Sequence, residues 1–137
     1  MTLVAVWLLT ACGSVIFLIG AYFIAARPSL LPEDARYMGS TVEGLIDVVP
    51  GLSGWLRRVF WVLGGFAGTT GVLVVYVAQT SLSSNRVSGL LVPAAVGAGS
   101  VGWMTVVNFM IRSAFRWALL TLCGLWALGL LAGLTAR

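Results

Sequence analysis

The chain contains four long apolar stretches that are free of charged residues. Each is at least about 20 residues long, which is enough for an α-helix to cross the hydrocarbon core of a bilayer. The stretches are continuously apolar rather than alternating, a pattern that favours helices over the strands of a membrane barrel. The pattern predicts a single domain, an all-α integral membrane four-helix bundle. Its four spans are expected near residues 3–25, 59–80, 88–111 and 117–135.

Residues 27–58 are the only part of the sequence with both signs of charge, and they contain all four acidic residues of the protein. Pro32, followed directly by two acidic residues, is typical of a helix start. A second helix is predicted to begin at Ser40, which would form a capping box with Glu43, and to end before a Pro-Gly pair. Its apolar residues repeat at helical spacing. We therefore expect a short amphipathic helix that lies along the membrane surface or against the bundle.

The composition agrees with a membrane protein, and the distribution of the charged residues predicts how the spans are oriented. The 137 residues are 60% hydrophobic and only 9% charged, too few charges to cover a soluble fold. Six arginines lie in residues 27–58 and in the turn between the last two spans, against two on the opposite side. By the positive-inside rule, this predicts a bacterial inner membrane protein with a cytoplasmic linker and both termini outside. The net charge of +4 is then explained by topology, and nucleic-acid binding is not expected.

The stretch LLTACGS, residues 8–14, resembles the cleavage site of a bacterial lipoprotein signal. Such a signal needs a basic N-terminal region, and no charged side chain precedes Cys12. The residues after Cys12 continue the apolar span instead of starting a polar tether. We therefore expect Cys12 to be a small residue packed within the first span.

Small residues recur at helical spacing in three of the spans. Helices in lipid gain little from hydrophobicity alone, and small residues allow their backbones to approach closely. The sequence therefore predicts faces that pack helices together or bind a partner helix. These faces consist of Gly64, Gly68 and Gly71 in the second span, Ala95, Gly99 and Gly102 in the third, and Gly129 and Gly133 in the fourth.

Two tryptophans, Trp103 and Trp126, lie deeper in their spans than the aromatic residues of an interfacial belt. We expect them to pack the bundle or to contact a lipid, a pigment, a quinone or a partner helix. The stretch GGFAGTTG resembles the Gly-rich, Thr-Thr signature of small dimeric fluoride channels. Gly71 and Val72 stand where that family has phenylalanines, so helix packing is the favoured interpretation of the glycines.

Groups that could carry chemistry are scarce. The protein has no histidine, its predicted spans contain no ionisable Asp, Glu, Lys or Arg, and its two cysteines lie in different spans. Four acids in the linker could hold a metal, but each suits a helix start or a solvated face (Glu33, Asp34, Glu43 and Asp47). We expect no catalytic residue, no metal site and no dedicated cofactor, although a bound lipid, pigment or quinone is compatible with the sequence. The protein is therefore not expected to be an enzyme.

The first 80 or so residues have a characteristic layout. A span ends at Arg27–Pro28, a polar linker follows, and the next span begins with RRVFWVLGGFAGTTGVLVVYVA. This layout resembles small uncharacterised bacterial four-helix membrane proteins of the DoxX-like kind. The resemblance implies a four-helix bundle and supplies no catalytic residues.

The abundance of helix-contact surface beside the scarcity of reactive groups indicates a non-catalytic accessory, structural or assembly subunit of a larger membrane complex. Its partners would be other membrane protein subunits and lipids. Two alternatives stay open. One is an oligomeric channel or carrier for a small solute with a path lined by Gly and Thr. The other is a lipid- or quinone-binding subunit built around Trp103 and Trp126.

Overall fold

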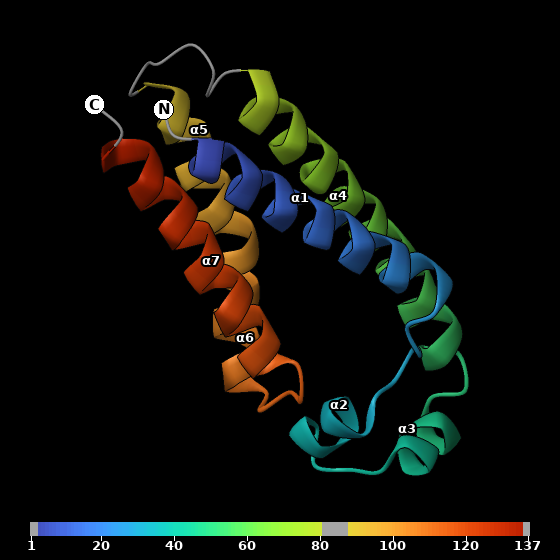
Figure 1. Ribbon diagram of the computed structural model, residues 1–137. Helices are drawn as coiled ribbons and strands as arrows, with labels where there is room; N and C mark the ends of the chain where they lie inside the picture. Colours follow the sequence, from blue (N-terminus) through green and yellow to red (C-terminus); the bar gives the residue numbers. More distant parts are fainter. Residues whose placement is uncertain (1–2, 81–87, 136–137) are drawn as a thin grey trace.

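The computed structural model describes residues 3–80 and 88–135, and the regular elements over these residues are all helical (Figure 1). Four helical segments are long and apolar enough to cross a membrane, as the sequence predicts. They are α1 (Leu3–Ala25), α4 (Leu52–Thr80), the third span (Gly89–Met110) and α7 (Arg116–Thr135). The prediction of an all-α fold with four spans is confirmed, and the protein is a multi-pass membrane protein.

The third span is a composite of three segments. It consists of α5 (Ser88–Gly97), the π-helical turn η2 (Ala98–Gly102) and α6 (Trp103–Met110). The backbone N–H of Trp103 donates to the carbonyl of Ala98, which is the wide spacing that defines a π turn. Such a turn inserts one extra residue, so it changes which side chains continue along each face of the helix.

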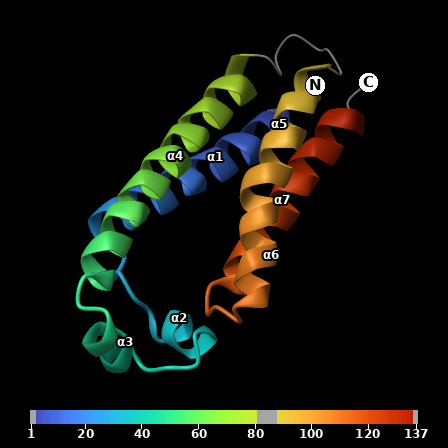
Figure 2. The ribbon, with the colours of Figure 1, turned by 180° about the vertical axis from the view of Figure 1, so that it is seen from behind.

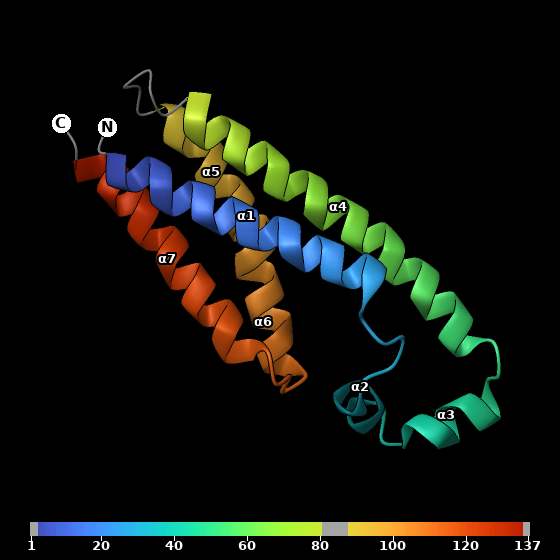
Figure 3. The same ribbon diagram turned by 45° about the vertical axis from the view of Figure 1, so that its right-hand side comes forward.

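The spans form two pairs, with α1 beside α4 and the third span beside α7 (Figures 1 and 2). The N-terminal half of α1 also packs against α7, so α1 joins the two pairs. The pairs lie closest near the two termini and diverge toward the end that carries the linker helices, as Figure 3 also shows. The buried core lies where α1, α4, the third span and α7 meet. Its members are Leu9, Cys12, Ile16, Val74, Ala78, Leu90, Val101, Leu122 and Trp126.

Cys12 is a free thiol in this core and is only 1% exposed, as expected for a small packed residue of the first span. Cys123 is also free and packs against the edge of the same cluster. Most other large apolar side chains of the described spans point outward. The outer surface of the spans is therefore apolar, as contact with lipid or with another membrane protein requires.

The linker contains two helices, α2 (Pro32–Tyr37) and α3 (Val42–Val48). The predicted start of the second helix at Ser40 is wrong by one residue, because the hydroxyl of Thr41 accepts from the N–H of Gly44. Ser40 instead closes the preceding helix: its N–H donates to the carbonyl of Ala35 across Gly39, which has a φ of +71°. This is the arrangement of a Schellman turn, so the backbone of Ser40 is already committed to α2.

The structure also corrects the start of the second span. Helix α4 begins at Leu52 and not near residue 59, so Arg57 and Arg58 lie within the helix. Its 29 residues extend over about 44 Å at 1.5 Å per residue, which exceeds the roughly 30 Å hydrocarbon core. The absence of charge marks only the part of a helix that lies in hydrocarbon. The first two turns of α4, which carry Arg57 and Arg58, are therefore the part that we expect to extend beyond the hydrocarbon.

Candidate functional site

Helices α1 and α4 approach each other backbone to backbone. A Cβ atom built on Gly20 would come within 2.6 Å of the carbonyl oxygen of Gly64 and closer still to the backbone nitrogen of Gly68. A Cβ atom on Gly71 would lie 2.5 Å from the carbonyl oxygen of Gly13. These distances leave no room for a side chain. Only glycine allows the two backbones to approach in this way.

This contact uses the three glycines that the sequence pattern selects in the second span, because Gly64, Gly68 and Gly71 all line the face of α4 toward α1. The opposite half of the contact consists of Gly13 and Gly20 of α1, which were not among the predicted packing residues. The signal was present: these two glycines are seven residues apart, the same two-turn spacing that separates Gly64 from Gly71. Residues seven apart lie on one face of a helix.

The glycines of the fourth span lie on the inner side of α7. Gly129 faces α1, where a Cβ atom would lie 3.1 Å from Cγ of Leu9 and 3.3 Å from Cβ of Leu8. Gly133 is buried one turn further along α7. Both residues therefore belong to the interior of the protein.

The predicted small-residue face of the third span has a different location. Ala95 and Gly99 are exposed and Gly102 is half-buried. A Cβ atom on Gly99 would meet no atom of the described residues within 4 Å, and one on Gly102 would approach only the carbonyl of Gly97 in the same span. We call Ala95, Gly99 and Gly102 the outer stripe. The chain leaves this stripe open, and its binding of a partner stays a prediction.

Gly97, which the pattern analysis did not select, makes the close contact of the third span instead. The three atoms nearest to a Cβ built there all belong to the indole ring of Trp126. Trp126 is only 3% exposed, and its Nε1–H donates to the carbonyl of Pro93 at 3.0 Å. Of the roles considered for Trp126, the structure gives it the packing role. Trp103, by contrast, is 66% exposed on the outside of the protein.

Polar contacts fix the linker to the opposite end of the bundle. The hydroxyl of Ser113, which is buried in the turn between α6 and α7, donates to Oε1 of Glu33 at 2.6 Å. Arg36 donates to the carbonyl of Arg112 at 3.2 Å, so α2 lies against this turn. Arg112 adopts a φ of +53°, a left-handed conformation that a residue in a tight turn can accept.

The end of α1 is fixed by an arginine. The guanidinium of Arg27 lies 3.5 Å from the centre of the Phe60 ring in α4 and pairs with Asp34 of α2 at 3.3 Å. Asp34 also accepts from the N–H of Leu31, which caps α2. The two acids of α2 therefore have structural partners. Across residues 3–80 and 88–135, His, Cys, Asp and Glu side chains do not form any group of three that could hold a metal.

No protein-family model, curated protein or solved structure matches this chain. The resemblance to DoxX-like proteins stays a prediction. The surfaces that the fold covers and those that it leaves open are therefore what indicates a function.

We predict that Gly20→Leu separates α1 from α4, because its side chain has no space between the two backbones. Overpacking at such a contact should lower the free energy of unfolding by about 3 kcal/mol. Unfolding of the purified protein in mixed micelles, followed by circular dichroism, measures this. Gly65→Leu is the matched control, because a Cβ atom on exposed Gly65 meets no described atom within 4 Å. Equal stability of the two variants would contradict the assignment of the contact.

We predict that Trp126→Phe destabilises the protein by about 1–3 kcal/mol, because it removes the donor to the buried carbonyl of Pro93. Trp103→Phe changes an exposed side chain and should cost about 0.5 kcal/mol or less. The same unfolding measurement compares the two. If both substitutions cost the same, the hydrogen bond of Trp126 has no structural role.

Proposed function

We propose that this protein is a non-catalytic accessory subunit of a larger membrane complex, and that it binds a transmembrane helix of another subunit on the outer stripe. The observation that carries the proposal is the exposure of Ala95 and Gly99 on the third span, with half-buried Gly102 following them. The glycines that the sequence pattern selects in the second and fourth spans are used by contacts within the chain or are buried. Those of the outer stripe are not.

The outer stripe has the chemistry that a partner helix needs in lipid. Ala95 and Gly99, four residues apart, form a shallow path along which a second backbone gains van der Waals contact and weak Cα–H···O bonds. The hydroxyl of Ser100, beside this path, already donates to the carbonyl of Val96 at 2.6 Å. Because this hydroxyl is already paired, the partner helix needs no polar side chain opposite it. An apolar helix with small residues of its own is the best complement to the outer stripe. Trp103 stands exposed beside the stripe and adds aromatic contact area.

The non-catalytic character rests on the composition of the membrane-embedded residues. Enzymes, proton-coupled carriers and redox subunits place ionisable or metal-ligating side chains inside the membrane. The four apolar stretches supply two cysteines and no acid, base or histidine. The side chains available there favour packing over group transfer.

The placement of the arginines supports a topology. The turn after α6 and the linker helices lie at the same end of the protein, joined by the bond from Arg36 to the carbonyl of Arg112 (Figure 1). Six of the eight arginines belong to this end. We propose that it faces the cytoplasm of a bacterial cell and that both termini lie outside the inner membrane.

A second candidate is an oligomeric channel or carrier, and one observation favours it. Thr69 is exposed on the outer side of α4, one turn after exposed Gly65. Several copies arranged around these residues would line a path with hydroxyl groups. Such a path would give a solute-specific leak in liposomes, and Thr69→Val should abolish it.

We predict that the tagged full chain, solubilised in a mild detergent, migrates as a complex in native electrophoresis and that Gly99→Leu converts it to the monomer. The leucine side chain would fill the path that a partner backbone occupies. Gly124→Leu is the matched control, because Gly124 is exposed on α7 with no described atom within 4 Å of a Cβ. Wild-type protein that runs as a monomer in several mild detergents would contradict the proposal. So would identical behaviour of the two variants.

A further inference from the structure

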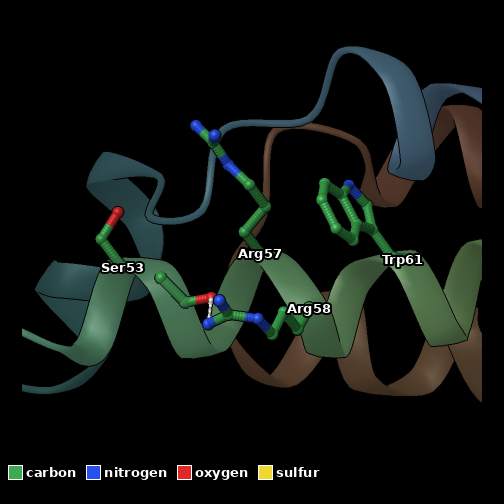
Figure 4. A pocket seen from close by; sticks show the side chains of 5 residues that line it. Ser53, Arg57, Arg58 and Trp61 are labelled. Atoms are coloured by element: carbon green, nitrogen blue, oxygen red, sulfur yellow. Dashed lines mark hydrogen bonds between the residues drawn. The ribbon is translucent and has the colours of Figure 1, made fainter.

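An open pocket of about 370 Å³ lies at the start of α4, away from the outer stripe (Figure 4). Its lining consists of Ser53, Gly54, Arg57, Arg58 and Trp61. All five residues belong to the first turns of α4, the part of the helix that precedes and enters the hydrocarbon core. The pocket is therefore a local feature of one helix surface.

The spacing of these residues explains the shape of the pocket. Ser53, Arg57 and Trp61 follow one another at intervals of four residues and form one ridge of the helix. Gly54 has no side chain, and a Cβ atom placed there would have only Nη1 of Arg58 near it, at 3.8 Å. The same Nη1 donates to the carbonyl of Gly54 at 3.2 Å, which draws the guanidinium back beside the gap (Figure 4). Because Gly54 has no side chain, the surface of the helix is open beside the side chains of Arg57 and Arg58.

The pocket is strongly cationic. Arg57 and Arg58 are both exposed, and in the described parts of the chain the one ion pair joins Arg27 to Asp34. Neither pocket arginine therefore has a carboxylate within ion-pair distance there. The Ser53 hydroxyl lies at the edge of the pocket, 2.5 Å from the hydroxyl of Ser29 in the linker. Two guanidinium groups beside a hydroxyl suit an anion with several acceptor oxygens, of which phosphate is the best match.

The position of the pocket on α4 indicates that the phosphate belongs to a lipid headgroup. Trp55 and Trp61 precede and follow the arginines along α4, and both are exposed. Exposed tryptophans beside arginines at the end of a span are typical of the lipid headgroup level. The ridge that begins at Gly54 and Arg58 continues down α4 as Val62 and Phe66, which are 59% and 71% exposed. Beside them Gly65 is exposed and adds no side chain to this surface. The cationic pocket is thus followed along α4 by an exposed apolar surface that an acyl chain can cover.

We propose that this pocket binds the phosphate headgroup of an anionic phospholipid, with Arg57 and Arg58 holding the phosphate oxygens. One acyl chain lies along Val62 and Phe66. The site is independent of the outer stripe and of any partner subunit. In this proposal, Arg57 and Arg58 select anionic phospholipids over neutral ones.

The test uses the purified full chain in phosphatidylcholine nanodiscs and the binding of fluorescent phosphatidylglycerol, followed by anisotropy. We expect saturable binding, and we expect the double variant Arg57→Gln/Arg58→Gln to weaken it about tenfold or more, since each arginine near an anionic surface contributes substantially. Arg116→Gln is the matched control, because Arg116 also precedes a span and lies next to a tryptophan, Trp117. It should change the affinity less than about twofold. Equal effects of the double variant and the control would overturn the proposal.

A second variant separates a shaped site from general attraction of charge. Gly54→Leu keeps both arginines and fills the floor of the pocket, so it should weaken binding of phosphatidylglycerol severalfold. Binding unchanged by Gly54→Leu would overturn the proposal, and this variant keeps it testable if the double variant fails to fold by circular dichroism. Inorganic phosphate is the competitor that distinguishes the sources. We expect it not to displace the lipid, and displacement that depends on Arg57 and Arg58 would assign the pocket to a free anion instead.

Discussion

The fold depends on the direct contact between the backbones of α1 and α4. Hydrocarbon surrounds the outer side of every span, so bringing two apolar helices together removes little apolar surface from water. Attraction must come from dispersion, which falls steeply as helices separate. Gly13 and Gly20 on α1, facing Gly64 and Gly71 on α4, remove the side chains that would hold the helices apart. The contact also brings Arg27 over the ring of Phe60 at the end of α1, which determines where the linker leaves the bundle.

The rest of the bundle repeats this principle with unequal partners. Where α7 meets α1, Gly129 makes room for Leu9, and where the third span meets α7, Gly97 makes room for the indole of Trp126. In each case a glycine on one helix accepts a large side chain from the other. Dispersion has little directional preference. The hydrogen bond from Trp126 to the carbonyl of Pro93 therefore fixes the position of α7 along the third span. Helix α1 is thereby fixed between α4 and α7 and joins the two helix pairs.

The two exposed surfaces for which we propose ligands differ in chemistry. The outer stripe of the third span is apolar and small, which suits a second helix. The pocket at the start of α4 is cationic and is flanked by exposed tryptophans, which suits an anionic lipid. They belong to different helices and different depths. A subunit that holds a neighbour through one surface and a lipid through the other would be fixed both within its complex and at a defined level in the membrane.

The sequence by itself determined the four spans and the two linker helices, because hydrophobic length, proline position and helix capping act over a few residues. Two predicted helix starts differ from the structure for local reasons. The N–H of Ser40 bonds within the turn that ends α2, so α3 begins after it, and α4 begins at Leu52, before the charge-free stretch. Only the tertiary structure decided which glycines are inside. Gly97 and Gly99 are two residues apart in one span, yet one contacts Trp126 and the other faces outward, because burial of a residue depends on which helix lies opposite it.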